Sequence, residues 1–422
     1  MPVVRACRSG VLTLAFLLPV FAAGLSVPAA AADDEAVLKR ARQLLRDGIL
    51  FDGHNDLPWA IRTDKKAPGD VVAYDLRARA GGHTDLARLR EGEVRAQFWS
   101  VYTPGEAPGG FARTQLEQID IARRVVERYP QAMVLAGTAA EIRAAHQRNL
   151  IGSMLGIEGG HAIENSLGAL RTYYDLGVRY MTLTHNTHTD WADSAAQTPA
   201  RHGGLNAFGE EVVREMNRLG MLVDLSHTSE GTMDDALRVS RAPVIFSHSA
   251  ARALCDVPRN VADEILARLP ANGGVIMVTF VAGFVDQDVA RVLQPKMAEF
   301  NQRSRGAKTD ADREKIYQEV LGSLQLPPTT IAKVADHFDH IRKVASAQNI
   351  GIGGDFDGNE FWPVGLSDVS MYPNLFAELI RRGWSDEELK AVAGGNVLRA
   401  LERAEAVAGE LRRTTPASLA KP

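Results

Sequence analysis

Residue types that bind divalent metal ions recur along the chain at the ends of short apolar runs. His54 and Asp56 end the first such run, and Asp355 ends the last, with Asp357 just beyond it. Four further runs end in a single residue of the same kind: Glu158, His185, His227 and His248. Imidazole and carboxylate groups without thiolates are typical ligands of catalytic zinc and similar divalent ions. These positions therefore form a candidate metal site.

The number of candidate ligands is larger than one tetrahedral catalytic metal ion requires. A site with two ions ~3.5–4 Å apart and a shared carboxylate would use most of them. Glu158 is the candidate for the shared carboxylate, because it lies in a glycine-rich turn with Gly156, Gly159 and Gly160. Two ions would bind and acidify a water molecule, which would supply a hydroxide nucleophile near neutral pH.

Each of these residues, taken alone, also has an ordinary structural interpretation. Glu158 could cap a turn or a helix, and Asp355 and Asp357 could do the same in the segment Gly-Gly-Asp-Phe-Asp-Gly. His227 and His248 could be histidines of the protein core. The placement of so many such residues at the ends of separate runs is what favours a metal site.

Eight apolar, β-branched runs are the candidate strands that would position these residues. They span residues 49–56, 94–102, 151–158, 178–185, 221–227, 243–248, 273–280 and 349–355. Helical spacing between the runs, as at Val212, Met216 and Leu219, predicts intervening helices. Gly220 lies directly before the next run, where a glycine commonly ends a helix. Alternating strands and helices predict an α/β fold with parallel strands.

Eight such units predict a (β/α)8 TIM-type barrel, and an open doubly wound sheet is the alternative. The carboxyl ends of barrel strands form one rim, so the separate segments would bring their polar residues to one pocket. Residues 60–93 and 281–348 interrupt the rhythm and are expected to be insertions after strands 1 and 7. The predicted organisation is one catalytic domain over residues 33–405 and a flexible tail over residues 406–422.

Residues 1–32 have the pattern of a secretory signal peptide. Arg5 and Arg8 precede an apolar run over residues 11–25, and small residues at 29–32 offer cleavage sites. A transmembrane anchor is the alternative, but the apolar run is shorter than the ~20 residues needed to span a bilayer. The mature protein is therefore expected to be exported to the periplasm or the extracellular space, without a membrane anchor.

Composition excludes several other classes of protein. Hydrophobic residues make up 45% and charged residues 24% of the 422 residues, which is typical of a soluble globular chain. The formal net charge of −4 argues against a protein that binds nucleic acid through bulk charge. The chain has only 2 cysteines, Cys7 and Cys255, and Cys7 lies in the leader. This cysteine content excludes a disulfide scaffold.

Seven short motifs, in this order along the chain, resemble the membrane dipeptidase (renal dipeptidase) family in its bacterial, secreted form. The motifs are Asp52-Gly-His54-Asn-Asp56-Leu-Pro-Trp59, Gly156-Ile-Glu158-Gly-Gly-His161, Leu183-Thr-His185-Asn, Asp224-Leu-Ser-His227, Phe246-Ser-His248-Ser, Arg259-Asn-Val261 and Gly353-Gly-Asp355-Phe-Asp-Gly358. The resemblance continues through residues 372–375 and 395–399 and covers nearly the whole mature chain.

This resemblance implies a metallo-dependent hydrolase with two zinc ions in each subunit and a dipeptide as its substrate. It assigns His54, Asp56 and Glu158 to one zinc ion. It assigns Glu158, His227 and His248 to the other, with Glu158 as the bridge. His185 would stabilise the oxyanion, Arg259 would bind the substrate carboxylate, and Asp355 would be the acid and base. The resemblance also implies a homodimer.

The predicted function is hydrolysis of dipeptides with a free C-terminal carboxylate by a hydroxide that bridges two zinc ions. Arg259 offers a planar fork that matches a carboxylate. Such a clamp close to the metal ions would leave room for one residue after the cleaved bond. Alternatively, Arg259 could form an ion pair with Asp256 or Asp263.

The sequence alone leaves two other functions open. The chain could hydrolyse a different amide that carries a carboxylate, such as a β-lactam or an N-acyl amino acid. It could also be an exported protein that binds metal ions or peptides without catalysis. Binding alone does not need Asp355 or His185, and their presence therefore favours an enzyme.

Overall fold

A closed barrel of parallel strands forms the centre of the molecule. The computed structural model describes residues 29–107, 109–304 and 310–422. The barrel strands are β1 (Leu50–Asn55), β2 (Val94–Tyr102), β4 (Ile151–Glu158), β5 (Val178–Thr182), β6 (Leu222–Asp224), β7 (Val244–Ser249), β8 (Val275–Val278) and β9 (Ile350–Ile352). All neighbouring pairs are parallel, and the pairing of β2 with β4 closes the ring. The predicted TIM-type (β/α)8 barrel is confirmed.

The eight predicted runs correspond to the eight barrel strands. One short strand, β3 (Met133–Leu135), was not predicted, and it pairs with the beginning of β4 outside the ring. Several runs continue past the point where the strand pairing stops. For example, β6 ends at Asp224, whereas the predicted run ends at His227. The apolar pattern therefore marks where the strands lie, and some of the residues at the ends of the runs, such as His227, lie in the loops just beyond the strands.

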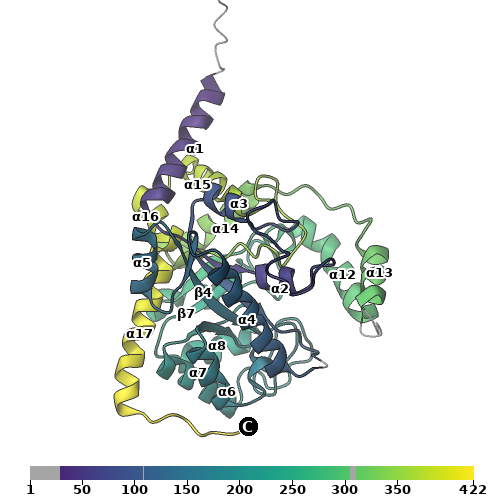
Figure 1. Cartoon of the computed structure of the whole chain (residues 1–422), viewed down its shortest axis with the longest axis vertical. Coiled ribbons are helices and arrows are strands. Elements are labelled where there is room, and N and C mark those ends of the chain that lie inside the picture. Colours follow the sequence, from purple (N-terminus) through teal and green to yellow (C-terminus); the bar gives the residue numbers. More distant parts are fainter. Residues whose placement is uncertain (1–28, 108, 305–309) are drawn as a thin grey trace, which may run out of the picture.

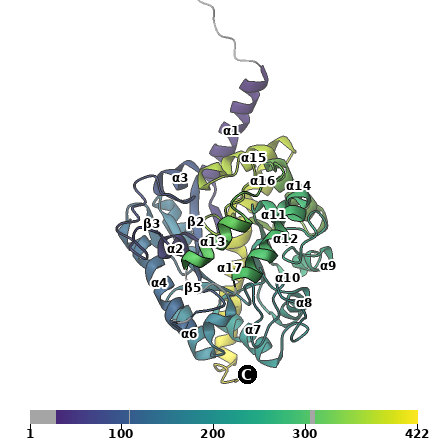
Figure 2. The same ribbon diagram turned by 90° about the vertical axis from the view of Figure 1, so that its right-hand side faces the viewer.

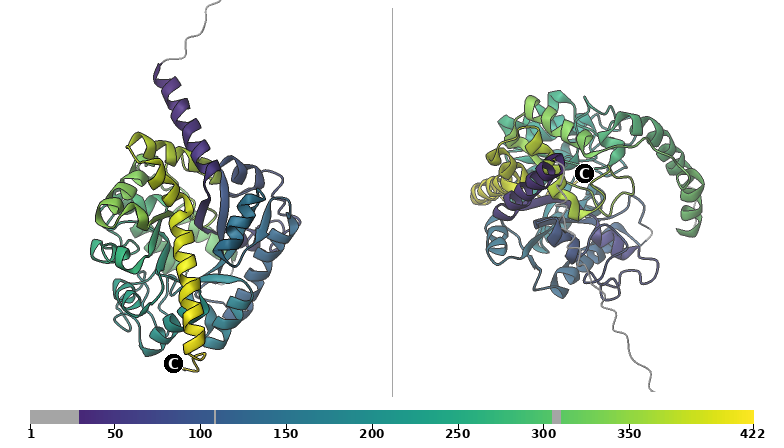
Figure 3. Two further views of the ribbon diagram at one scale, coloured as in Figure 1. Left: turned by 90° about the vertical axis from the view of Figure 1, so that its left-hand side faces the viewer. Right: turned by 90° about the horizontal axis from the view of Figure 1, so that it is seen from above.

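The helices flank the barrel, and α17 crosses one end of it (Figure 1; Figure 3, left). In the first half of the chain they are α1 (Ala29–Asp47), α2 (Leu57–Arg62), α3 (Leu86–Glu91), α4 (Phe111–Arg128), α5 (Ala139–Gln147), η1 (Gly160–Ile163), α6 (Leu167–Asp175), α7 (Ala207–Leu219) and α8 (Glu230–Val239). In the second half they are α9 (Asp263–Leu266), α10 (Leu269–Asn272), α11 (Ala282–Val285), α12 (Gln287–Ser304), α13 (Asp310–Val320), α14 (Ile331–Val344), η2 (Ala347–Asn349), η3 (Val369–Met371), α15 (Tyr372–Arg381), α16 (Asp386–Lys390), η4 (Ala391–Gly395) and α17 (Asn396–Thr414).

Local sequence signals set many of these helix ends. The Asn206 side chain caps α7 by accepting a hydrogen bond from the Gly209 N–H. The Ser229 side chain caps α8 by accepting one from the Thr232 N–H. Gly220 ends α7 in the left-handed conformation, with φ of 84°. The predicted stop at this glycine is thus confirmed, and it turns the chain directly into β6.

Aromatic side chains fill the interior of the barrel. The Phe98 ring lies 5.0 Å from Phe51 and 4.8 Å from Tyr180, measured between ring centroids. Helix α17 closes the end of the barrel where the strands begin, and its residues Val397 and Leu401 belong to the same buried cluster. Tyr180 connects this cluster to the predicted site, because its hydroxyl lies 2.8 Å from His54 Nδ1.

The two predicted insertions lie around the rim. Segment 60–93 contains α3 and contacts the loop after β9, since the His83 N–H donates a hydrogen bond to Asp357 Oδ1 over 2.6 Å. Helices α12 and α13 lie on the side of the barrel opposite to α17 and extend away from the body (Figure 2; Figure 3, right). They enclose a small apolar cluster of their own, which includes Phe300 and Val320.

The described terminal segments pack against outer helices, α1 against α15 and the segment after α17 against α7. Most of the predicted signal peptide, residues 1–32, lies outside the described residues, which begin with α1 at Ala29. Residues 406–414, predicted to be part of a flexible tail, are the end of α17 in this structure. Beyond it, the Ser418 hydroxyl donates to Glu211. None of the helices among the described residues is both long and apolar enough to cross a membrane.

His337 on α14 ties two rim segments together and makes the stability of the fold sensitive to acid. The Ala251 N–H donates to Nδ1, and Nε2–H donates to the Val285 carbonyl, both over 3.1 Å. Burial lowers the pKa of His337 to about 4. The unfolded chain takes up this proton near pH 6.5, so the fold loses stability as the pH falls from about 6.5 to 4.

We expect this residue to contribute about 3 kcal/mol to the pH dependence of unfolding in the metal-free protein. The free energy of unfolding is measured by denaturant titration from pH 7 to pH 4. Its decrease over this range should be smaller in H337Q than in the wild type, by up to about 3 kcal/mol. The control is Val334→Ala, a buried substitution on the same helix. It should lower the stability equally at each pH. An unchanged slope in H337Q would contradict the role of His337.

Candidate metal centre

The predicted site residues converge at the carboxyl ends of the barrel strands. His54 lies in β1, Glu158 ends β4, and His248 lies in β7. The others follow their strands by a few residues: Asp56, His185, His227 and Asp355 come after β1, β5, β6 and β9. The polar groups meet below the surface of the molecule. His54 is fully buried, and the Glu158 residue is only 5% exposed.

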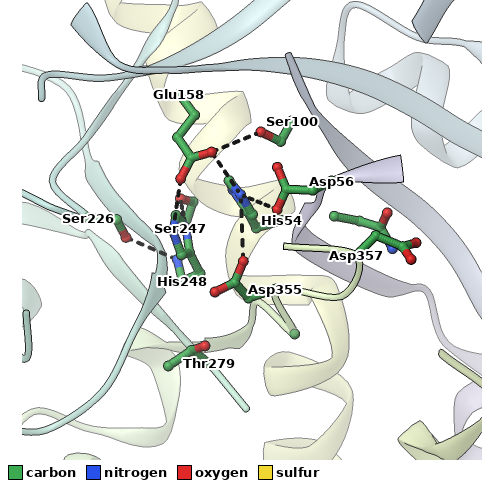
Figure 4. Close-up of polar contacts among 12 residues, drawn as sticks. His54, Asp56, Ser100, Glu158, Ser226, Ser247, His248, Thr279, Asp355 and Asp357 are labelled. Carbon is green, nitrogen blue, oxygen red and sulfur yellow. Dashed lines mark hydrogen bonds and ion pairs between the residues drawn. The ribbon is translucent and has the colours of Figure 1, made fainter. Parts of the chain in front are cut away.

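His54 stands at the centre of one half of the site (Figure 4). Its Nε2 lies 3.2 Å from Asp56 Oδ2, 3.6 Å from Glu158 Oε2 and 4.0 Å from Asp355 Oδ1. Ser100 on β2 donates a hydrogen bond to the same Glu158 oxygen over 3.2 Å. One imidazole nitrogen and three carboxylates thus face a common point.

The second oxygen of Glu158 faces the other half of the site. Its Oε1 lies 3.1 Å from His227 Nε2, 3.4 Å from His248 Nε2 and 3.6 Å from His185 Nε2. In Figure 4 the Glu158 carboxylate lies between His54 and His248. Each oxygen therefore addresses a separate set of histidines, which is the geometry that a bridging carboxylate requires.

Hydrogen bonds on the far side of the rings fix which nitrogen of each histidine is available. The Nδ1 of His227 lies 3.1 Å from Asn186 Oδ1, and the Nδ1 of His248 lies 2.8 Å from Ser247 Oγ. Since Asn186 Oδ1 can only accept, His227 carries its proton on Nδ1. The Nε2 atom of His227 then has no proton, and its lone pair is directed into the site.

The donor set fits divalent cations. The bare Nε2 atoms of His227 and His248 face each other at 3.0 Å, next to a carboxylate oxygen. The fully buried Nε2 of His54 has no hydrogen-bond partner among the described residues. Lone pairs converging without a proton between them repel one another, and a cation removes that repulsion. Three groups of possible ligands, each with its ligand atoms within 4.8 Å of one another, share these residues: His54–Glu158–His248, Glu158–His185–His227 and His54–Asp56–Asp355.

Burial disfavours the charged form of the groups in the site, but at His54 the neighbouring Tyr180, Asp56 and Glu158 outweigh this effect and raise the pKa well above its ordinary value. Burial lowers the pKa of His185, His227 and His248 well below the ordinary value, so these rings stay neutral. It raises the pKa of Glu158, and that of Asp355 well above the usual range. Neutral imidazoles are the form that binds metal ions, and the buried carboxylates gain from a cation beside them.

The backbone takes an uncommon conformation at the rim. His227 and Asp355 have φ of 65° and 64°, in the left-handed region that residues other than glycine rarely occupy. Gly358 passes so close that a Cβ there would lie 2.3 Å from Asp56 Oδ2 and 2.7 Å from Asp355 Oδ1. Strained backbone of this kind clusters at functional sites, where it aims side chains at a ligand.

His185 lies at the edge of the cluster, where an oxyanion could reach it. Its ring makes an edge-on contact with Tyr102, with ring centroids 4.8 Å apart, and a tilted contact with His227 at 4.3 Å. The ring is partly accessible, and its Nε2 points towards Glu158. It can therefore serve as a further metal ligand or as a hydrogen-bonding group beside a bound metal ion.

Arg259 is a buried cation beside the possible metal ligands. Its guanidinium donates to Ser249 Oγ over 2.7 Å and to the His248 carbonyl over 2.9 Å. Burial lowers its pKa to about 10, which leaves it charged at neutral pH. Among the described residues no carboxylate pairs with it within 4 Å, and its buried Nε has no acceptor. The alternative pairing with Asp256 or Asp263 does not occur, and His340 contacts Asp263 instead.

Several residues that complete the site carried no assigned role in the sequence analysis. They are Ser100, Tyr180, Asn186 and Ser249, which contact Glu158, His54, His227 and Arg259 respectively. Two of them, Asn186 in Leu-Thr-His-Asn and Ser249 in Phe-Ser-His-Ser, stand directly after a predicted site histidine. His188, near the rim, does not join the cluster, because its Nδ1 accepts a hydrogen bond from the Ser194 N–H over 2.9 Å.

A (β/α)8 barrel with histidines and carboxylates gathered at its carboxyl rim defines a metal-dependent hydrolase. Within this class of hydrolases, the sequence identifies the family. The profile of the family "Membrane dipeptidase (Peptidase family M19)" matches residues 38–415, and the chain belongs to this family. It is a hydrolase of the metallopeptidase type, a dipeptidase by family.

Known relatives agree with this assignment. The chain is 42% identical to dipeptidase 3 of Rattus norvegicus over 381 residues, which cover 89% of this chain and 69% of the relative. It is also 42% identical to dipeptidase 3 of Homo sapiens over 384 residues, with 89% and 69% covered. These similarities extend over the whole barrel.

Solved structures share the fold. The probable dipeptidase PvdM from Pseudomonas aeruginosa superposes with a TM-score of 0.76 at 23% identity, over 88% of this chain and 99% of that one. A metallopeptidase from Rhodobacter sphaeroides, liganded with a phosphinate mimic of the dipeptide L-Ala-D-Ala, superposes with a TM-score of 0.67 at 25% identity. That comparison covers 85% of this chain and 100% of the other.

Proposed function

We propose that this protein is a zinc-dependent dipeptidase that cleaves dipeptides with a free C-terminal carboxylate. The observation that carries the proposal is the position of Glu158, whose two oxygens face His54 on one side and His227 and His248 on the other. A carboxylate in this position can bind two ions at once and hold them as the pair that a two-metal hydrolase uses.

Two zinc ions would be held by residues that the barrel already gathers. His54, Asp56 and Glu158 would hold one ion, and Glu158, His227 and His248 the other. Ions held there would polarise the substrate carbonyl and would lower the pKa of a bound water, so that a hydroxide would be available near neutral pH. The rest of the reaction depends on side chains of this chain.

Three residues would act directly on the substrate. Arg259 would bind the C-terminal carboxylate through its planar fork. His185 would donate a hydrogen bond to the oxygen that becomes negative as the carbonyl is attacked. Asp355, with its raised pKa, would take a proton from the attacking water and deliver it to the leaving amine.

The spacing of these groups supports a dipeptide over a longer peptide. Arg259 bonds to the carbonyl of His248, whose ring faces the Glu158 carboxylate. A substrate carboxylate bound by Arg259 would therefore lie close to the proposed metal ions, which leaves room for one residue after the cleaved bond. The dipeptide mimic bound by the metallopeptidase from Rhodobacter sphaeroides is consistent with a substrate of that length.

Removal of the metal ions should abolish activity. We expect chelator-treated protein to lose turnover of L-Ala-L-Ala and L-Ala-D-Ala, and two equivalents of zinc per chain to restore it. The measurement is release of free alanine, with bound zinc determined by elemental analysis. Tripeptides and C-terminally amidated dipeptides should be poor substrates, because they place no carboxylate at Arg259.

The same assay separates this proposal from its alternatives. A β-lactam and an N-acetyl amino acid, tested beside the dipeptides, would be the better substrates if the chain hydrolysed a different amide. Absence of turnover of all these compounds in zinc-replete protein would indicate a binding protein and would refute the proposal.

Export and assembly are further parts of the proposal. The apolar leader supports export to the periplasm or the extracellular space after cleavage near residue 32. The family supports a homodimer, to be tested by sedimentation of the mature chain. Residues 33–405 would form the single catalytic domain of each subunit.

A further inference from the structure

We propose that Asp224 is a positioning residue that, through the Ser247 hydroxyl, holds His248 in the tautomer that binds metal. This inference rests on the proposed metal site, and it adds a residue to which that proposal gives no role.

Asp224 is a fully buried carboxylate at the end of β6, where both of its oxygens are used. Oδ1 accepts hydrogen bonds from the N–H groups of Ser226 and Ser247, over 3.1 and 2.8 Å. Oδ2 accepts from the hydroxyls of Thr182 and Ser247, over 2.5 and 2.6 Å. Four donors around one buried carboxylate stabilise its charge and fix its orientation.

The direction of these hydrogen bonds decides where His248 carries its proton. The single hydrogen of the Ser247 hydroxyl goes to Asp224 Oδ2, which can only accept. Ser247 Oγ must then accept a hydrogen bond from the Nδ1 of His248, 2.8 Å away. The proton of His248 is therefore on Nδ1, and its Nε2 lone pair points at Glu158 Oε1 over 3.4 Å.

The other two histidines proposed as metal ligands have no such connection to a carboxylate through their Nδ1 atoms among the described residues. His54 Nδ1 contacts the Tyr180 hydroxyl over 2.8 Å, and His227 Nδ1 contacts the Asn186 amide over 3.1 Å. Both partners are uncharged groups. A carboxylate beyond the hydroxyl makes the ring of a ligating histidine a stronger donor to its metal ion. His248 is thus the histidine whose ligand strength depends on a buried anion.

Substitution of Asp224 with asparagine reverses this chain of hydrogen bonds. The new amide oxygen must stay at the Oδ1 position, because two backbone N–H groups point there. The amide NH2 group then faces the Ser247 hydroxyl and donates to it. The hydroxyl hydrogen is released to point at His248 Nδ1, which moves the imidazole proton to Nε2 and blocks the metal-binding lone pair.

The experiment measures metal affinity and the tautomer in the same proteins. Zinc is titrated into the metal-free wild type and D224N in competition with a chromophoric chelator. We expect one of the two zinc affinities to fall by about 10- to 100-fold in D224N and the other to stay within about threefold. In metal-free protein with 15N-labelled histidine, the nitrogen shifts of His248 should change from the Nδ1–H to the Nε2–H pattern.

Two further variants keep the test decisive. Ser247→Ala removes the connecting hydroxyl with a smaller change and should weaken the same zinc site, even if D224N does not fold. Thr182→Val is the matched control, because it removes another hydrogen bond to the same Asp224 oxygen and leaves Ser247 in place. It should keep both affinities.

The outcomes separate this inference from the proposed function. Wild-type protein that binds no zinc would refute the metal site itself. Wild-type protein that binds two equivalents, with unchanged affinities and an unchanged His248 tautomer in D224N, would overturn the role of Asp224 alone. An equal loss in Thr182→Val would also overturn it, because the effect would then reflect general packing.

Discussion

Asp355→Asn is expected to leave zinc binding nearly intact and to lower kcat on dipeptides by about 10²- to 10⁴-fold. The Asp355 carboxylate is buried beside Asp56 and Glu158, and this environment raises its pKa well above the usual range. A group with a raised pKa can accept a proton from water and release it to the leaving amine in the same cycle. Asparagine has nearly the same shape and cannot carry that proton.

Asp355 lies close enough to His54 to bind the same metal ion, so the zinc content of the variant has to be measured. Asp355 Oδ1 lies 4.0 Å from His54 Nε2, and it shares a possible ligand group with His54 and Asp56. Zinc content and kcat are therefore measured in the same preparation of the variant. Loss of one zinc ion in Asp355→Asn would identify Asp355 as a ligand and refute its role as the proton carrier.

Arg259→Ala is expected to lower kcat/KM on L-Ala-L-Ala by roughly 30- to 5,000-fold, which corresponds to about 2–5 kcal/mol. The variant removes a buried cation that has no carboxylate partner among the described residues, and the substrate would supply that partner. On the C-terminally amidated dipeptide, which lacks the charge, the loss should stay within about tenfold.

The comparison of the two substrates is needed because Arg259 also supports the site. It donates hydrogen bonds to Ser249 and to the backbone of His248. Damage to that support would slow both substrates equally, and such a result would rule out the carboxylate clamp. Arg259→Lys, which keeps the charge without the planar fork, should fall between the wild type and Arg259→Ala on the free dipeptide.

The sequence was sufficient to predict the barrel and the position of its chemistry. Each of the eight apolar runs became a strand, because a strand buried on both faces needs a continuous apolar segment, whatever the rest of the chain does. The residues at the ends of those runs then had to meet, since parallel strands of a barrel share one rim. His54, Glu158 and His248, from three distant segments, are an example.

Features that depend on contacts between distant segments could not be predicted in this way. Strand β3 is too short for its pattern to stand out, and it exists because β4 offers an edge to pair with. Helices α12 and α13 enclose their own apolar cluster, whereas sequence periodicity alone showed only an insertion.

The same division holds within the site. The sequence determined which groups could bind metal, because histidine and carboxylate chemistry is a property of the residue itself. Only the tertiary structure decided how each group is presented. Ser247 and Asp224 lie within the recognised motifs but received no role from the sequence, and their hydrogen bonds to each other and to His248 appear only in the folded chain. Tautomers, buried charges and unpaired cations follow from neighbours on other strands, and those neighbours are known only once the chain has folded.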